Sequence, residues 1–246
     1  MPKQAEKDYL AHIGAAGVEH ALGKPWTNPD CGTTLTAIGT IMALLPPPPG
    51  RLLDLGCGSG WTSVMFAQRG YFVVGQDIAP DMIALAEENK RRSGLGHIGF
   101  VVADYEALDY RDEFDGAVFF DALHHAEDET AALTSAYRAL KAGGTLITHE
   151  PGEGHSVHPG SIEAMHRFGV TERDMPPHHI IRVARDIGFR GAKSYPLPDD
   201  IFRASYLSPR AARFPGAIGR AIRCLEFFRY QFHHFGRRGG LVVLTK

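Results

Sequence analysis

A glycine-rich segment offers this sequence a place to bind a small molecule against its backbone. Residues 56–60 (GCGSG) hold three glycines in five positions and follow directly on the apolar run 51–55. Glycines let a ligand approach the main chain, and the free N–H groups at the start of a following helix favour a carboxylate or a phosphate. The dinucleotide pattern G-x-G-x-x-G is not completed, because Trp61 stands where a glycine is needed counting from Gly56. A pyrophosphate cofactor therefore fits poorly.

Two acidic residues end the next apolar runs along the chain. Asp77 closes residues 71–77, and Asp104, followed by Tyr105, closes residues 97–104. An acid at the tip of a strand can accept both hydroxyls of a ribose, and the next one can accept from an exocyclic amine beside an aromatic ring. Each acid alone could equally be a helix cap or a turn residue. Their order along the chain favours a nucleoside site.

Candidate proton acceptors follow the two apolar runs after those. His124 and His125 come after residues 114–123, and Glu150 ends the run 145–150, next to His149. A substrate hydroxyl that attacks an electrophile needs a general base, and histidines and carboxylates are the usual groups. The same histidines could simply hold the loop. We expect His124 or His125 to act as the base, with Glu150 orienting it or sharing the role.

The stretch from residue 151 to residue 178 is too long for a simple connection, and we expect a lid loop over the site. It carries four histidines, which are His155, His158, His166 and His178. Acidic residues nearby make a Mg²⁺, Mn²⁺ or Fe²⁺ centre conceivable. Polar lid residues or a substrate-binding histidine are the alternatives, and the spacing H-x-x-H on a loop is unspecific. We predict no metal and place His155 among the catalytic candidates.

The elements that must position these residues alternate between strand and helix. Apolar runs without polar alternation, separated by helical segments such as 80–93 and 129–144, the second closed by Gly143 and Gly144, predict an α/β domain with a parallel sheet covered on both faces. We expect one domain over residues 1–246, divided into four parts. These are a helical cap (1–49), a cofactor-binding core (50–150), the lid loop (151–178) and a helical insert rich in arginine and aromatic residues (199–238).

Five segments in order resemble a class I S-adenosylmethionine-dependent methyltransferase: LLDLGCGSG, VVGQDIAPDMIALA, VVADYEAL, FDGAVFFDALHHAED and YRALKAGGTLITHEP. The resemblance covers roughly residues 51–151. It implies a Rossmann-like sheet of seven strands in the order 3-2-1-4-5-7-6, with the last strand antiparallel. It also implies S-adenosylmethionine as the cofactor, which carries no phosphate. The histidine pair is similar to that of small-molecule and sugar O-methyltransferases.

The resemblance further implies which residues contact the cofactor. Those beside its methionine portion are Asp54, which would hold the ammonium group, with Gly56, Cys57, Gly58, Phe120 and Asp121. Those beside its adenosine portion are Asp77 on the ribose, Ile78 against adenine, Asp104 on the adenine amine, and Tyr105. In the helical cap, Tyr9 and Trp26 are candidates to cover the sulfonium, although they could equally pack between helices.

The insert is chemically distinct from the rest of the chain. Residues 201–240 contain eight arginines, no lysine and one acidic residue, Glu226. Ile222, Leu225, Phe228 and Phe232 follow helical spacing. One interpretation is a helix that packs its apolar side on the sheet and leaves its arginines in water. Another is a basic surface for an anionic substrate or membrane headgroups, and RNA is a lesser option.

Composition bounds the remaining possibilities. The formal net charge of −2 gives no global attraction to nucleic acid, and the polar N-terminus lacks a signal-peptide core. No apolar run is long enough for a bilayer, and the three cysteines fit neither a zinc site nor a disulfide framework. We therefore expect a cytoplasmic enzyme that O-methylates a small molecule or saccharide, and an anionic acceptor would suit the arginine-rich insert. The alternatives are a non-catalytic cofactor-binding partner subunit and a metal-assisted enzyme that uses the histidine-rich lid.

Overall fold

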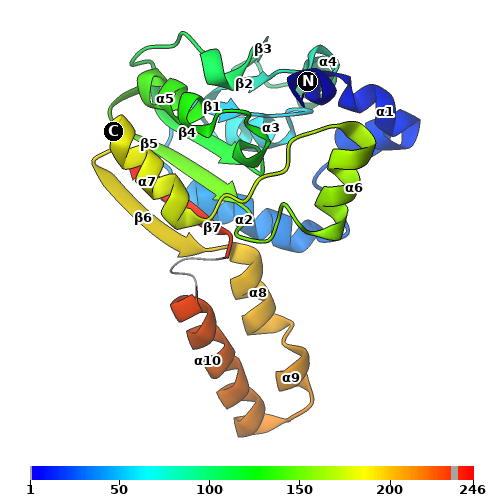
Figure 1. Cartoon of the computed structure of the whole chain (residues 1–246), viewed down its shortest axis with the longest axis vertical. Coiled ribbons are helices and arrows are strands. Elements are labelled where there is room, and N and C mark those ends of the chain that lie inside the picture. The colour runs from blue at the N-terminus through cyan, green and yellow to red at the C-terminus, as the bar shows by residue number, and fades with distance from the viewer. Residues whose placement is uncertain (1, 234–237) are drawn as a thin grey trace.

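A seven-stranded sheet forms the centre of the computed structural model, which describes residues 2–233 and 238–246 (Figure 1). Its strands run in the order β3-β2-β1-β4-β5-β7-β6, and β7 is antiparallel to both of its neighbours. The predicted fold class and strand order are therefore confirmed. The strands are β1 (Arg51–Leu55), β2 (Phe72–Asp77), β3 (Ile98–Val102), β4 (Phe114–Phe120), β5 (Leu140–Glu150), β6 (Gly191–Pro196) and β7 (Gly240–Thr245).

Helices connect the strands and cover both faces of the sheet (Figure 1). The helices of the core are α2 (Cys31–Leu44), α3 (Trp61–Arg69), α4 (Pro80–Ser93), α5 (Glu129–Ala139) and α7 (Pro177–Ile187). The others are α1 (Pro2–Gly23), α6 (Pro159–Phe168), α8 (Pro198–Tyr206), α9 (Pro209–Ala212) and α10 (Gly216–His233). Two short 3₁₀ turns, η1 (Tyr105–Ala107) and η2 (Leu123–His125), follow β3 and β4.

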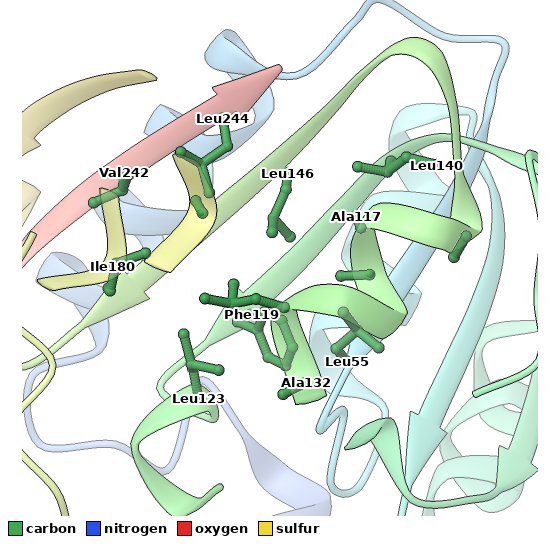
Figure 2. Close-up of a cluster of buried hydrophobic side chains, with 14 of the residues drawn as sticks. Leu55, Ala117, Phe119, Leu123, Ala132, Leu140, Leu146, Ile180, Val242 and Leu244 are labelled. Atoms are coloured by element: carbon green, nitrogen blue, oxygen red, sulfur yellow. The ribbon is translucent and has the colours of Figure 1, made fainter. Parts of the chain in front are cut away.

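Each central strand sends buried side chains to both faces of the sheet. In β4, Phe119 packs into a cluster with α5 and α7, whereas its neighbour Val118 packs into a second cluster with α2 and α3. Both side chains are fully buried. Figure 2 shows the first cluster, where Leu146 and Val242 from adjacent strands meet residues of α5 and α7. Burial on both faces explains why these strands lack polar alternation.

Three features of the fold differ from the sequence-based expectations. The helix expected to reach Gly143 ends at Ala139, and β5 begins at Leu140, so the residues KAGG belong to the strand. The region 151–178 is not only a loop, because it contains α6, which Pro159 and Gly169 bound at its two ends. The insert contains three helices, and they contact α2 through α8 instead of packing on the sheet.

The helices that precede the core lie beside elements far away in sequence. Helix α1 contacts α4 and α6, and Tyr9 packs edge-on against Phe168 of α6 with ring centroids 5.2 Å apart. Helices α1 and α6 therefore form one cover next to the carboxyl ends of the parallel strands.

Within residues 2–233 and 238–246, no helix has the length and apolar character needed to cross a membrane.

Removing the buried ring at the centre of the sheet tests this packing. We expect Phe119→Ala to lower the free energy of unfolding by about 3–5 kcal/mol, because the change deletes buried apolar surface and leaves a cavity. Urea denaturation followed by circular dichroism measures the loss. Phe72→Ala is the matched control, since Phe72 is 56% exposed. A loss under about 1 kcal/mol for Phe119→Ala would contradict the packing described.

Candidate functional site

Two adjoining cavities open at the carboxyl ends of the parallel strands. The first, of about 340 Å³, is lined by Asp77, Ile78 and Tyr105, and we call it the Tyr105 cavity. The second, of about 230 Å³, is lined by Cys57, Phe120 and His149, and we call it the His149 cavity. The two share part of their lining, so they form one cleft with two lobes. The shared residues are Lys24, Gly56, Gly58, Met82 and Asp121.

The three glycines of the loop after β1 serve two different purposes. All three have a positive φ, which side chains disfavour. A Cβ on Gly56 would lie 2.6 Å from the Cβ of Ala122, and one on Gly60 would lie 2.5 Å from the Phe100 ring. A Cβ on Gly58 would meet nothing within 4 Å, and this residue lines both cavities. Gly56 and Gly60 therefore permit internal packing, whereas Gly58 keeps open the space that a ligand would fill.

The end of β2 holds the glycine loop in place. Asp77 accepts hydrogen bonds from the N–H groups of Gly58, at 2.8 Å, and Ala79, at 2.9 Å. Burial raises the pKa of Asp77, and these backbone donors oppose the rise. The fully buried Gln76 accepts from the Gly56 N–H at 3.4 Å and donates to the Ala103 carbonyl. Gln76 thus links β1 to β3, a role that the sequence analysis missed.

Two predicted cofactor contacts lie outside the lining of both cavities. Asp54 is buried, and its Oδ2 accepts from the hydroxyls of Thr62 and Ser63, both at 2.6 Å. Burial raises the pKa of Asp54 to about 6, against the effect of those two hydroxyls. Asp104 forms an ion pair with Lys3 at 2.6 Å and caps η1. In this structure the two acids secure α3 and α1, and their contacts with a cofactor stay predictions.

The His149 cavity combines charged groups from three parts of the chain. His149 Nδ1 lies 2.9 Å from Asp121 Oδ1, and its ring stacks on Phe120 at 4.6 Å between centroids. Burial would raise the pKa of Asp121, but His149 outweighs it and holds that pKa below its usual range. Among the described residues, the buried His149 Nε2 has no hydrogen-bond partner. Lys24 enters from the segment after α1, and burial lowers its pKa despite the opposing charge of Asp121.

The histidine pair after β4 is held by the carboxylate that ends β5. Glu150 is fully buried and accepts from the backbone N–H groups of Ala122, Leu123 and His124 at 3.1, 2.8 and 3.3 Å. His124 Nδ1 lies 2.7 Å from the same carboxylate. Burial lowers the pKa of His124, but Glu150 outweighs this effect and leaves the pKa raised. Of the two histidines, His125 lines the Tyr105 cavity and His124 does not.

His125 is oriented by a backbone carbonyl. Its Nδ1 lies 2.7 Å from the Thr171 oxygen, so Nδ1 carries the proton and Nε2 keeps its lone pair. Burial lowers the pKa of His125 to about 4, and the neighbouring His124 adds to this effect. A base with this pKa takes up a proton weakly at neutral pH.

The region 151–178 contributes a second carboxylate next to the histidines. Glu172 lies 2.6 Å from His155 Nε2 and 3.6 Å from His124 Nε2. Ligand atoms of His124, His125 and Glu172 lie within 4.8 Å of one another, a spacing that could accommodate a metal ion. Each of these groups also has a partner within the protein, and the expected absence of a metal stays a prediction. His155 contacts Glu172 and does not line either cavity.

A carboxylate on α1, which the sequence analysis missed, completes the Tyr105 cavity. Glu6 accepts from the Thr171 N–H at 3.1 Å and lies 3.5 Å from His125 Nδ1. Burial raises the pKa of Glu6 to about 7, and the Thr171 N–H opposes the rise. Tyr9, one turn later, also lines this cavity, whereas Trp26 is 72% exposed and lines neither. No local motif marks Glu6, because its role depends on where α1 docks.

Comparison with known proteins accords with this geometry. Residues 53–148 match the family model described as a methyltransferase domain. The chain carries a methyltransferase domain. This segment contains the glycine loop, the ends of β2 and β3, and the turn after β4, which is the side of the cleft that the sheet provides. The resemblance to methyltransferases that the sequence indicated is thereby confirmed.

Part of the chain is similar to curated methyltransferases. The chain is 38% identical over 108 residues to a ubiquinone biosynthesis O-methyltransferase of Cereibacter sphaeroides, covering 44% of this chain and 43% of that protein. It is 37% identical over 109 residues to a demethylmenaquinone methyltransferase of Thermus thermophilus, covering 43% and 49%. The aligned segment thus spans less than half the length of either relative.

The likeness extends over the whole chain at the level of the fold. Geranyl diphosphate C-methyltransferase from Streptomyces coelicolor, solved with Mg²⁺, geranyl-S-thiolodiphosphate and S-adenosyl-L-homocysteine, superposes with a TM-score of 0.70. The superposition covers 100% of this chain and 98% of that one, at 15% identity. The methyltransferase domain and the elements around it therefore follow a known arrangement.

The raised pKa of Glu6 makes a prediction about stability. A carboxyl group whose pKa rises from 4.5 to about 7 on folding is protonated in the folded state where the unfolded state has lost the proton. Stability therefore falls as the pH rises through this interval and is unaffected below it. Glu6→Gln keeps the acceptor for Thr171 and removes this dependence.

We expect the melting temperature of Glu6→Gln, relative to the unmodified protein, to rise between pH 4.5 and pH 7. Differential scanning fluorimetry across this range measures the difference. Glu163→Gln, at an exposed position on α6, is the control and should show a constant difference. The same constant difference for Glu6→Gln would show that the Glu6 carboxyl has an ordinary pKa.

Proposed function

We propose that this chain is an S-adenosylmethionine-dependent methyltransferase that methylates a hydroxyl group of a small molecule or saccharide. The observation that carries the proposal is the two-lobed cleft, which is bounded by the methyltransferase domain on one side and by α1, Lys24 and the region 151–178 on the other. The methyltransferase domain also supports the cofactor predicted from the sequence. When bound, that cofactor supplies an electrophilic methyl carbon on a sulfonium.

The residues of this chain fit an adenosyl sulfonium in two respects. The open space at Gly58 leaves room along the backbone, and the unpaired, buried Nε2 of His149 offers a polar contact. We assign the part of the Tyr105 cavity beside Asp77 and Ile78 to adenosine, with Asp77 on the ribose and Ile78 against the base, and the part beside Glu6 and His125 to the acceptor. We assign the His149 cavity to the methionine portion. The Lys24 ammonium, at the junction of the lobes, would pair with the cofactor carboxylate.

The acceptor would enter beside His125 and Glu6, which both line the Tyr105 cavity. A hydroxyl becomes a better nucleophile as its proton leaves, so a base poised near neutral pH contributes most. The pKa of Glu6, about 7, suits this role better than that of His125, about 4. We therefore assign proton uptake to the Glu6 carboxylate and orientation of the hydroxyl to His125 Nε2. This pair, Glu6 and His125, would be held in place by His124, Glu150 and His155.

The names of the relatives favour oxygen as the acceptor atom, since those from Cereibacter sphaeroides and several other bacteria are O-methyltransferases. A non-catalytic cofactor-binding subunit is the alternative from another class. Formation of S-adenosylhomocysteine with a panel of phenols, sugars and hydroxy acids separates the two. Repeating the assay with a chelator tests the metal-assisted alternative at the cluster of His124, His125 and Glu172.

Replacing Lys24 tests the assignment of the two lobes. Lys24→Met removes the ammonium but keeps much of the side-chain volume. A charge-assisted hydrogen bond contributes about 1.5–3 kcal/mol, so S-adenosylhomocysteine should bind roughly ten- to a hundredfold more weakly by calorimetry. Adenosine has no carboxylate, and its affinity should not change. Equal losses for both ligands would mean that Lys24 acts through the structure of the cleft and not through the carboxylate.

The assignment of the base makes a prediction about the pH dependence of turnover. With Glu6 as the base, kcat/KM should rise with pH up to about 7 and then level off, because only the carboxylate accepts a proton. Glu6→Gln should lower kcat about 10²–10⁴-fold and leave S-adenosylhomocysteine affinity unchanged. Glu163→Gln again serves as the control. A rise centred near pH 4 would instead assign the base to His125.

A further inference from the structure

The insert forms a helical hairpin that projects from the body of the protein (Figure 1). We call the segment from α8 through α10, residues 198–233, the arginine hairpin. Helix α10 packs against α8 and α9, and α8 is attached to α2. An ion pair between Arg203 and Asp30, at 3.2 Å, adds to this attachment. The far part of the hairpin therefore presents much of its surface to the surroundings.

One face of α10 is apolar and exposed along most of the helix. At 3.6 residues per turn, six residues share this face, and all six are exposed. They are Ala217, Ile218, Ala221, Cys224, Leu225 and Phe228. Leu225 is 69% exposed and Phe228 60% exposed. The expectation that Leu225 and Phe228 pack inside the protein is therefore wrong, while the side chain of Phe232 lies outside the described residues.

The opposite face of α10 packs against α8 and α9. This packing explains why one face of the helix is exposed and the other is not. Gly219 is buried there, and Ile222, Glu226 and Tyr230 are partly buried. The hairpin as a whole concentrates exposed apolar side chains. Of the thirteen large hydrophobic residues exposed in the described part of the chain, seven lie on it. They are Tyr206, Leu207, Phe214, Ile218, Leu225, Phe227 and Phe228.

Arginines border the apolar face on both sides. Helical spacing places Arg220 along one edge and Arg229 along the other, and both are exposed. Beside Arg229, a cavity of about 470 Å³ lies between the helices of the hairpin and is lined by four arginines and one acid. The arginines are Arg203, Arg210, Arg229 and Arg238, and the acid is Glu226. Guanidinium groups in such number suit phosphate oxygens, which they bind in a bidentate manner.

We propose that the arginine hairpin docks on the surface of a bilayer that contains anionic lipids. The apolar face of α10 would lie among the upper acyl chains, and the bordering arginines and the arginine-lined cavity would contact headgroup phosphates. An amphipathic helix with a basic polar face binds membranes in this orientation, parallel to the surface. The proposal concerns a part of the chain outside the cleft and does not depend on methyl transfer.

A second copy of the chain is a weaker candidate for the same face. A twofold contact through the apolar faces would bring Arg220 and Arg229 of both copies together. Glu226 is the one acid on the hairpin beyond the first turn of α8, and it faces the cavity. Like charges in such proximity oppose association, whereas an anionic lipid surface attracts the same charges.

Vesicle binding tests the proposal directly. The full chain is mixed with vesicles of phosphatidylcholine alone, or of phosphatidylcholine with an equal part of phosphatidylglycerol, and binding is measured by flotation. We expect binding to the anionic vesicles, little binding to the neutral ones, and release at high salt. Equal binding to both, or to neither, overturns the proposal. A stable dimer in light scattering that Leu225→Ser/Phe228→Ser abolishes would assign the face to a second copy.

Charge-matched variants distinguish membrane binding through the hairpin from attraction by the net charge of the whole protein. Each basic residue near an anionic surface contributes about fivefold in affinity, so replacing three arginines should weaken binding roughly a hundredfold. The test variant replaces the exposed Arg210, Arg220 and Arg229 with Gln. The control replaces three exposed arginines of the body, Arg69, Arg111 and Arg185, with Gln. Equal losses in the two triple variants would overturn the assignment to the hairpin.

Cys224 provides a readout of insertion that a purely electrostatic contact would not give. It is exposed on the apolar face, whereas Cys57 is buried and Cys31 is partly buried. In a Cys31→Ser background, a polarity-sensitive fluorophore on Cys224 should shift to shorter wavelength with anionic vesicles. An unshifted emission spectrum for vesicle-bound protein would mean that the apolar face stays in water, contrary to the proposal.

Discussion

The arrangement of the cleft depends on one buried carboxylate. Glu150 lies at the end of β5, without exposure to solvent, and accepts the backbone N–H groups of the turn after β4. Burying a charged group is costly unless hydrogen bonds replace its hydration, and here three N–H groups and the His124 ring do so. The turn that carries His124 and His125 is thereby tied to the neighbouring strand. Glu150 thus holds the histidine pair in position, which is one of the two roles expected from the sequence, and its share in proton transfer stays a prediction.

Side chains that accept hydrogen bonds from backbone N–H groups also organise the other side of the cleft. Side chains at the strand ends satisfy the backbone of the glycine loop: Asp77 accepts from Gly58, and Gln76 accepts from Gly56. Polar groups of the loop are thus paired within the protein, while the space beside Gly58 stays open. A rigid loop with an open side needs little reordering when a ligand binds, which reduces the entropic cost of binding. The sheet provides this rigidity, because its central strands are buried on both faces.

The groups that face the sheet across the cleft come from distant parts of the chain. Glu6 and Tyr9 lie on α1, Lys24 follows it, and Glu172 comes from the region after α6. Contacts between α1 and α6 unite these segments into one cover. In the function we propose, this cover carries the groups that face the acceptor and so selects the substrate, whereas most of the sheet side lies within residues 53–148, which match the methyltransferase family model. The arginine hairpin, attached through α8, adds a surface whose chemistry differs from both.

Local signals in the sequence predicted the α/β class and the strand ends that face the cleft: apolar runs, clustered glycines, and acids at fixed places after strands. The sheet order and the methyltransferase domain followed from the resemblance of five ordered segments to class I methyltransferases. The sequence could not determine the use of Asp54 and Asp104, whose partners Thr62, Ser63 and Lys3 come from packing. Nor could it locate Glu6, or divide the apolar residues of α10 between the hairpin interior and the solvent. Those features depend on contacts between segments remote in sequence, and only the folded chain brings such segments together.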